Sequence, residues 1–177
     1  ATSIRPGQPI WQFSEMDPTV NRWHEIQNFL FHEANLLDER QWDNWLDLYL
    51  ENAEYWVPYK WDQQSPTDHV SLFYEDFTLL RMRIDRLKNE LSPTETPPSR
   101  TNHHLTNVTI LDDLGESLTA KAYLIFVEFR RNEQRWFSAR VTWNLKVLEG
   151  AIRISAKRVD LLNSDQERGH LRFATPI

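Results

Sequence analysis

The second half of the chain contains four long segments with the spacing of β-strands, at about residues 101–111, 117–130, 135–148 and 151–162. The third segment alternates cleanly, with apolar or small side chains at the odd positions from Phe137 to Val147 and polar ones between them. Because successive side chains of a strand point to opposite faces, this pattern predicts a strand with one buried face. The short junctions between the segments are the size of hairpin turns, so the sequence predicts an antiparallel meander.

Two of these segments depart from simple alternation. The second is apolar on both faces from Tyr123 to Val127, which predicts a central strand that is covered on two sides. In the fourth, the apolar positions change parity between Ile154 and Val159, which predicts a β-bulge near Lys157-Arg158.

The first half of the chain has helical periodicity instead. Asp17-Pro18 is typical of an N-cap followed by the first helical residue, and apolar side chains then recur every three or four positions as far as Leu37. The sequence next predicts a second short helix at residues 42–49, a break at Asn52 and a short strand at residues 55–57. It then predicts a loop at residues 62–68, a third helix at 77–87 and an irregular connection at 92–99.

Helices followed by a meander of long strands indicate an α+β fold with the helices on one face of an antiparallel sheet. Long, bulged strands curl, so we expect a curved sheet that wraps around the helices and encloses a cone-shaped hollow. The length of 177 residues predicts a single domain over residues 1–177, with an N-terminal arm at 1–16 and a C-terminal tail at 166–177.

The composition excludes several classes of function. The sequence has no cysteine, which excludes disulfides, cysteine nucleophiles, thiolate zinc sites and an iron–sulfur cluster bound by this chain. Its net charge of −6 disfavours binding to nucleic acid. No apolar run approaches the roughly 18 residues that span a bilayer, and the first ten residues do not resemble a signal peptide. We therefore expect a cytoplasmic protein without nucleic-acid or membrane partners.

The histidines do not predict a metal site. His24 and His32 lie on one predicted helix, about 12 Å apart along its axis and roughly 80° apart around it. His103 and His104 are neighbours in a strand and face opposite sides of the sheet. The polar pair His32-Glu33 lacks the second histidine of a zinc-protease motif, and we interpret it as structural.

The sequence also allows an acid–base site inside the cone, because one of His103 and His104 must face the inside. Its candidate partners are Asp43, Asp47, Tyr49 and Tyr55. Such a pair could serve a free-standing dehydratase or isomerase that needs no cofactor. A ligand-binding module of the same fold is a third possibility.

Several segments, taken together, resemble the beta (small) subunits of aromatic-ring-hydroxylating dioxygenases. The matching segments are His32–Asp38, Trp45–Tyr49, Tyr55–Pro58, Arg81–Leu87, Pro98–Val108 and Ile154–Asn163. Each is weak alone, but together they follow the order and spacing of that family over residues 21–165.

The resemblance implies a cystatin-like or NTF2-like cone and a non-catalytic subunit with a structural and assembly role and some influence on substrate preference. It implies a homotrimer of this chain with three large alpha subunits, as alpha3beta3. The resemblance also implies that the alpha subunit binds a Rieske 2Fe–2S cluster and a mononuclear Fe(II). Electrons from NADH are then expected to support dihydroxylation of an aromatic compound with O2. No catalytic, cofactor or metal residue is carried over to this chain.

The conspicuous side chains are then candidates for packing and docking. We expect Trp42, Trp45 and Trp56 in the core. A basic group in this acidic chain supplies the subunit-contact candidates, which are Arg81, Arg83, Arg86 and Arg100.

Overall fold

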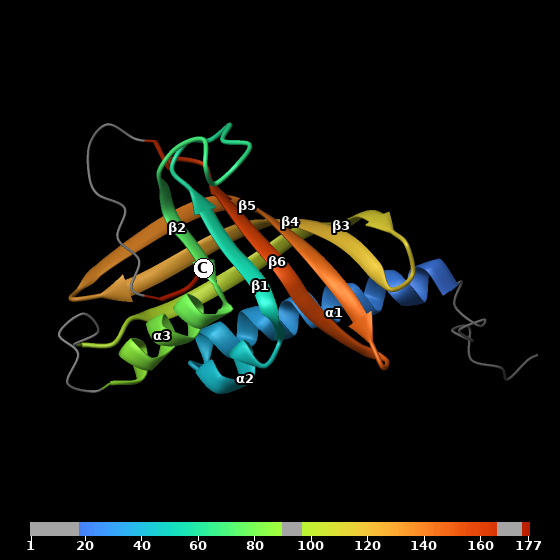
Figure 1. Cartoon of the computed structure of the whole chain (residues 1–177). Coiled ribbons are helices and arrows are strands. Elements are labelled where there is room, and N and C mark those ends of the chain that lie inside the picture. Colours follow the sequence, from blue (N-terminus) through green and yellow to red (C-terminus); the bar gives the residue numbers. More distant parts are fainter. Residues whose placement is uncertain (1–17, 90–96, 166–174) are drawn as a thin grey trace, which may run out of the picture.

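The computed structural model describes residues 18–89, 97–165 and 175–177, which form three helices and a curved sheet (Figure 1). The elements in chain order are α1 (Pro18–Asp38), α2 (Trp42–Leu46), β1 (Tyr49–Pro58), β2 (Ser71–Asp76), α3 (Phe77–Lys88), β3 (Arg100–Asp113), β4 (Ser117–Arg130), β5 (Glu133–Leu148) and β6 (Ala151–Leu161). The described strands form one sheet in the order β2-β1-β6-β5-β4-β3.

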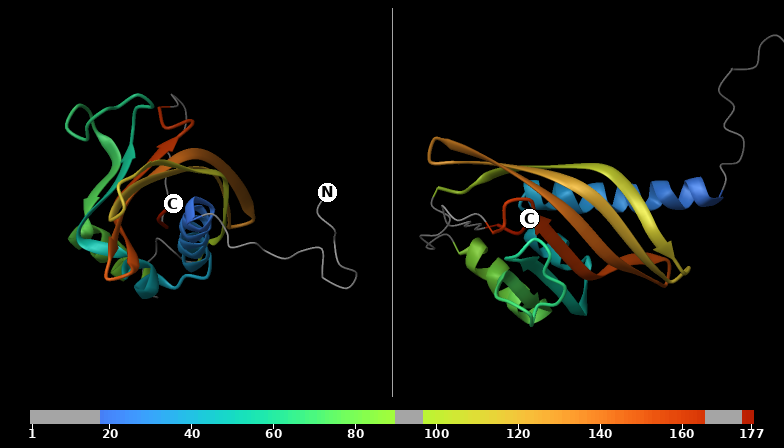
Figure 2. Two further views of the ribbon diagram at one scale, coloured as in Figure 1. Left: turned by 90° about the vertical axis from the view of Figure 1, so that its right-hand side faces the viewer. Right: turned by 90° about the horizontal axis from the view of Figure 1, so that it is seen from above.

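The sheet bends around α1, and α2 and α3 pack near one end of it (Figure 2). Neighbouring strands are antiparallel except β1 and β6, which run parallel and join the N-terminal hairpin to the C-terminal meander. The predicted α+β fold, with N-terminal helices on a curved antiparallel sheet, is confirmed. The four long strands also lie within a few residues of their predicted bounds.

The helices form where apolar side chains recur on one face. Ile26, Leu30 and Leu37 of α1 are almost completely buried beneath the sheet. Helix α3 begins at an N-cap, because the Asp76 carboxylate accepts a hydrogen bond of 2.8 Å from the backbone N–H of Leu79. The predicted N-cap of α1, Asp17, lies outside the described residues.

Strand β1 is longer than predicted. It begins at Tyr49, where we expected the end of a helix, and continues through Asn52, where we expected a break. The pairing of β1 with β6 shifts register between Tyr49 and Glu54, so the predicted break corresponds to an irregularity inside a strand. The strand continues through Asn52 because residues before and after it, Tyr49 and Glu54, both pair with β6.

The bulge in β6 lies earlier than predicted. Asn144 pairs with Ala156 and Leu145 with Ile154, which leaves Ser155 as the extra residue instead of Lys157-Arg158. The bulge therefore turns Lys157 toward the interior of the cone, where it is buried.

Of the two expected terminal segments, the structure describes only the end of the C-terminal tail. The expected arm at 1–16 lies outside the described residues, as does most of the expected tail. Residues 175–177 are described and are buried inside the cone. Among the described residues, no helix has the length and apolar character needed to cross a membrane.

Candidate functional site

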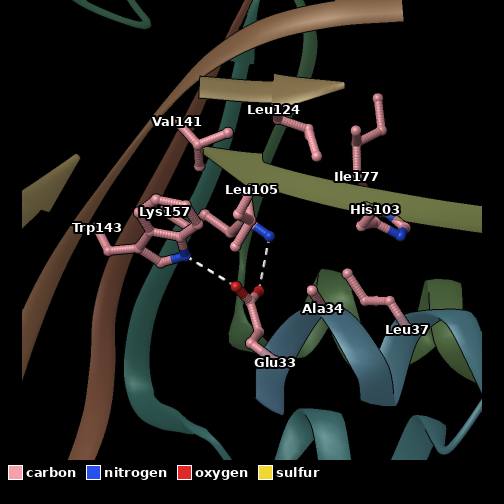
Figure 3. Close-up of a pocket in the computed structure, with 10 residues that line it drawn as sticks. All are labelled: Glu33, Ala34, Leu37, His103, Leu105, Leu124, Val141, Trp143, Lys157 and Ile177. Carbon is pink, nitrogen blue, oxygen red and sulfur yellow. Dashed lines mark hydrogen bonds and ion pairs between the residues drawn. The ribbon is translucent and has the colours of Figure 1, made fainter. Parts of the chain in front are cut away.

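A buried cluster of polar side chains connects α1 to the sheet, with Glu33 at its centre (Figure 3). The Glu33 carboxylate accepts hydrogen bonds from the indole N–H groups of Trp45 and Trp143, at 3.1 and 2.9 Å. Tyr49 donates its hydroxyl to the same carboxylate at 3.4 Å, and the Lys157 ammonium lies 2.6 Å from it. A carboxylate that is only 1% exposed is thus fully surrounded by donors.

The cluster depends on long-range register as much as on helix periodicity. Glu33 lies on the face of α1 that packs under the sheet, and Lys157 faces it because of the bulge at Ser155. Trp143 pairs directly with Lys157 across β5 and β6, so both side chains project to the same side. The interpretation of Glu33 as structural agrees with these contacts, although its burial was not predicted.

A second, partly buried pair joins the end of α1 to β3. Nδ1 of His103 lies 2.6 Å from Oδ1 of Asp38, and the backbone N–H of His103 donates to the other carboxylate oxygen at 2.8 Å. Thr101 donates its hydroxyl to the same carboxylate at 2.9 Å. Burial raises the pKa of Asp38, but its contacts with His103 and the hydrogen bond from Thr101 outweigh burial and hold the pKa below its ordinary value.

The inward histidine is therefore His103, and its partner is none of the expected residues. Asp43 is exposed and pairs with Lys88 at 2.7 Å, and Asp47 is also exposed. The missed partner, Asp38, is the last residue of α1, where a carboxylate can reach the neighbouring strand. The signal in the sequence was the position of Asp38, directly after Leu37 at the end of the apolar stripe of α1.

The two tyrosines proposed as acid–base partners have structural contacts. Tyr49 belongs to the Glu33 cluster, and the hydroxyl of Tyr55 lies 3.0 Å from both the backbone N–H and the carbonyl oxygen of Ile177. Burial is the largest cause that raises the pKa of both hydroxyls, and the charge of Glu33 adds to it. Both side chains therefore act as neutral hydrogen-bonding groups.

The cavity beside these pairs is too small for an aromatic substrate. It has a volume of about 10 Å³, and most of its lining is apolar, including Leu105, Leu124 and Ile177. Sites for small molecules typically enclose roughly 300–1,000 Å³. This cavity therefore offers no room for the substrate of a free-standing dehydratase or isomerase.

The other histidines of the metal analysis lie apart from this cavity. His24 and His32 are exposed on α1, and His104 is exposed on the opposite face of the sheet from His103. Within residues 18–89, 97–165 and 175–177, no group of three or more histidine, aspartate or glutamate side chains is arranged to hold a metal ion.

The outer face of the sheet carries exposed apolar side chains. On β4, Leu124 and Phe126 are buried inside the cone, whereas Tyr123 and Ile125, which alternate with them, are 41% and 43% exposed. The prediction that this strand is covered on both faces is wrong for the single chain, because only its inner face is covered. Its outer side chains have the composition of a buried surface.

Two further residues extend this surface. Trp136 of β5 pairs with Val127 of β4 and is 63% exposed. Leu162, which follows β6, donates its backbone N–H to the carbonyl of Ser138 and is 65% exposed. We call these side chains the outer-face patch, which consists of Tyr123, Ile125, Trp136 and Leu162.

The loop between β1 and β2 covers a different part of the outer face. Arg158 of β6 donates to the backbone carbonyl of Gln63 at 2.7 Å, and the guanidinium of Arg140 lies 5.3 Å from the ring centroid of Trp61. Trp56 is half-buried below Arg158, whereas Trp42 and Trp45 are buried as expected. The loop leaves the outer-face patch open.

The four candidate arginines do not share one environment. Arg83 is engaged inside the chain, where its guanidinium binds the Glu75 carboxylate and lies 3.6 Å from the ring centroid of Phe73. Arg81 and Arg86 are exposed on α3, and Arg100 is exposed at the start of β3. Only these three present their guanidinium groups at the surface.

Comparison with known proteins identifies related chains. Residues 32–166 match the family described as "Ring hydroxylating beta subunit". The chain is 34% identical over 145 residues to the 2-halobenzoate 1,2-dioxygenase small subunit of Burkholderia cepacia, an alignment that covers 78% of this chain and 87% of that protein. It is 33% identical over 120 residues to the benzoate 1,2-dioxygenase beta subunit of Acinetobacter baylyi, which covers 64% and 70% of the two chains.

Solved structures show the same fold. The beta subunit of the benzoate 1,2-dioxygenase from Burkholderia mallei superposes with a TM-score of 0.70 at 28% identity, covering 88% of this chain and 97% of that one. A chain of naphthalene 1,2-dioxygenase superposes with a TM-score of 0.70 at 22% identity, covering 84% and 82% of the two chains. The second similarity concerns the fold alone.

Proposed function

Because this chain belongs to the family of ring-hydroxylating beta subunits, we propose that its role is to build and support the assembly of an aromatic-ring dioxygenase. The chain is a non-catalytic subunit of such a multicomponent enzyme. The described interior contains a structural hydrogen-bond cluster beside a cavity of only about 10 Å³, which supports a structural role.

The reaction centre then lies in a large alpha subunit. We place a Rieske 2Fe–2S cluster and a mononuclear Fe(II) in that partner. The absence of cysteine from this chain supports the assignment of the cluster, because Rieske centres need two cysteine ligands. The present chain supplies a rigid surface on which the large subunit is held.

The observation that carries this proposal is the outer-face patch. Strand β4 has apolar side chains on both faces, but one chain covers only the inner face. Interfaces between identical subunits are more apolar than the remaining surface, and aromatic residues are enriched in them. We therefore assign the patch to contacts between copies of this chain, in a homotrimer.

The exposed arginines suit a different contact. Arg81, Arg86 and Arg100 lie on the surface of a chain with a net charge of −6, so their basic character is local. Guanidinium groups form directional, bidentate bonds with carboxylates. We assign these three side chains to contacts with the alpha subunit, in an alpha3beta3 complex.

The relatives also favour a substrate class. Matches at 30–34% identity include subunits of dioxygenases named for 2-halobenzoate, benzoate, toluate, p-cumate and anthranilate. Matches at 27–28% identity include the biphenyl and benzene enzymes. We propose that the assembled enzyme oxidises a single aromatic ring that bears a carboxylate.

Light scattering on the purified chain tests the self-association proposal. The unaltered chain is expected to be a trimer, and Ile125→Asp is expected to shift it to monomers, because a charge would be buried in an apolar interface. Leu114→Asp is the matched control, since Leu114 is 75% exposed in the β3–β4 turn, away from the patch. A trimer that survives Ile125→Asp and Trp136→Asp would contradict the assignment of this face.

Co-purification tests the enzyme assignment. Expressed together with the alpha subunit, the chain is expected to form a stable complex that consumes O2 with benzoate and NADH when the reductase is present. The isolated chain is expected to show no turnover. A chain that converts a substrate without a partner would contradict the non-catalytic role.

A further inference from the structure

Three polar side chains line the small cavity between α1 and the sheet. They are Glu33 from α1, His103 from β3 and Lys157 from β6, and the rest of the lining is mainly apolar (Figure 3). The cavity volume of about 10 Å³ is close to what a single water molecule requires. The cavity therefore combines the volume for one small molecule with polar groups that could bind it.

His103 presents an unsatisfied nitrogen at this site. Its side chain is only 3% exposed, and Nδ1 lies 2.6 Å from the Asp38 carboxylate. Since a carboxylate can only accept, Nδ1 must carry the hydrogen, and Nε2 of the neutral ring is then an acceptor. Nε2 is buried without a hydrogen-bond partner in the described part of the chain. A buried acceptor without a hydrogen bond is unfavourable, so a donor is expected there.

Lys157 supplies donors on another side of the cavity. Its ammonium group carries three N–H bonds, and its contact of 2.6 Å with Glu33 uses one of them. The charges of Lys157 and Glu33 cancel, so the cavity favours a neutral ligand over a cation or an anion. The ligand must both donate to His103 and accept from Lys157, and water does both.

We propose that the cavity binds one ordered water molecule, which accepts a hydrogen bond from Nζ of Lys157 and donates one to Nε2 of His103. The water joins the Asp38–His103 pair to the Glu33–Lys157 pair in a continuous network. Through this network α1 is bonded to both β3 and β6, which are far apart in the strand order. The site is a structural device of the cone and is independent of which surface binds the alpha subunit.

A high-resolution crystal structure of the chain in complex with its alpha subunit tests the proposal. We expect one fully occupied water peak at about 2.7–3.2 Å from both Nε2 of His103 and Nζ of Lys157. An empty cavity, a larger ligand or a protein donor on Nε2 would overturn it.

Two variants identify the partner of the water. His103→Phe keeps an aromatic ring but removes the acceptor, and loss of the water peak is expected. His104→Phe is the matched control, because this neighbouring histidine faces the outside of the sheet, and it should leave the peak unchanged. A water that remains at full occupancy in His103→Phe would rule out the proposed bond.

A measurement on the unaltered chain decides the matter if His103→Phe does not fold. Nitrogen-15 NMR of the histidine ring at neutral pH is expected to show the neutral Nδ1–H tautomer, with Nε2 shifted as an acceptor in a hydrogen bond. A resonance typical of an unbonded Nε2, or a hydrogen on Nε2, would contradict the proposal.

Discussion

Nζ of Lys157 lies 2.6 Å from Oε1 of Glu33, and the two side chains are 3% and 2% exposed. The pair joins the C-terminal part of α1 to β6. A buried pair of this kind contributes little over an apolar pair of the same shape, but either charge alone is strongly unfavourable in the core.

Lys157→Met is therefore expected to lower the free energy of unfolding by about 3–5 kcal/mol, since it leaves the Glu33 carboxylate buried without its counter-charge. Urea unfolding followed by tryptophan fluorescence measures the loss. The double variant Glu33→Gln, Lys157→Met is the control and should recover much of the stability. Equal losses in the single and double variants would contradict the pairing.

Asp38→Asn is expected to change how stability depends on pH. The pKa of Asp38 in the folded chain is below its ordinary value of 3.8, so the unfolded chain binds the proton more readily. The contribution of this carboxylate is therefore present above about pH 4 and is lost as the pH falls through the folded pKa.

The stability difference between the unaltered chain and Asp38→Asn should thus be roughly 1.5–3 kcal/mol at neutral pH, the range for a hydrogen bond to a charged group. It should shrink below pH 4 in urea titrations at a series of pH values. Asp43→Asn is the control, because Asp43 forms an exposed pair with Lys88 and should change stability by less than about 1 kcal/mol. A constant difference at all pH values would contradict the expectation.

Tyr55→Phe tests the attachment of residues 175–177 inside the cone. The substitution removes the hydroxyl that contacts both backbone groups of Ile177, so a loss of about 1–3 kcal/mol is expected. Thermal unfolding measures it. Tyr74→Phe removes a hydroxyl that donates to Glu54 at an exposed position, and it should have a much smaller effect.

The arginines are expected to separate into two groups. Arg86→Ala and Arg100→Ala should weaken binding of the alpha subunit about tenfold or more and leave the unfolding midpoint of the isolated chain within a few degrees, because both are surface side chains. Arg83→Ala should instead lower the midpoint, since its partner Glu75 is half-buried in the same chain. Surface plasmon resonance and thermal unfolding distinguish the two effects. Unchanged binding in Arg86→Ala and Arg100→Ala would exclude these contacts.

The fold was predictable where its signals are local. The alternation over 137–147 and the apolar stripe of α1 each determine an element without reference to other segments. Strand β2 was missed because Ser71–Asp76 alternates weakly and is half exposed, and only pairing with β1 defines it. The place of the β6 bulge was likewise set by the partner strand, opposite Asn144 and Leu145.

The interior pairs were harder to predict than the elements that carry them. That one of two adjacent histidines must face inward follows from strand geometry, and His103 is that residue. Its partner Asp38 and the Glu33–Lys157 pair depend on how α1 is placed under the sheet, which no local pattern specifies. The sequence also predicts that the outer side of β4 is covered, but in the single chain Tyr123 and Ile125 are exposed there.

The parallel pairing of β1 with β6 has a consequence for biosynthesis. Strand β1 is among the first elements to leave the ribosome, yet its central partner is the last strand to be made. Contacts between distant segments slow folding, and incomplete sheets expose edges that aggregate. In the nascent chain, the edge of β1 that pairs with β6 therefore remains unpaired until β6 has been synthesised. Binding of a chaperone at this stage is expected to raise the yield of folded chain.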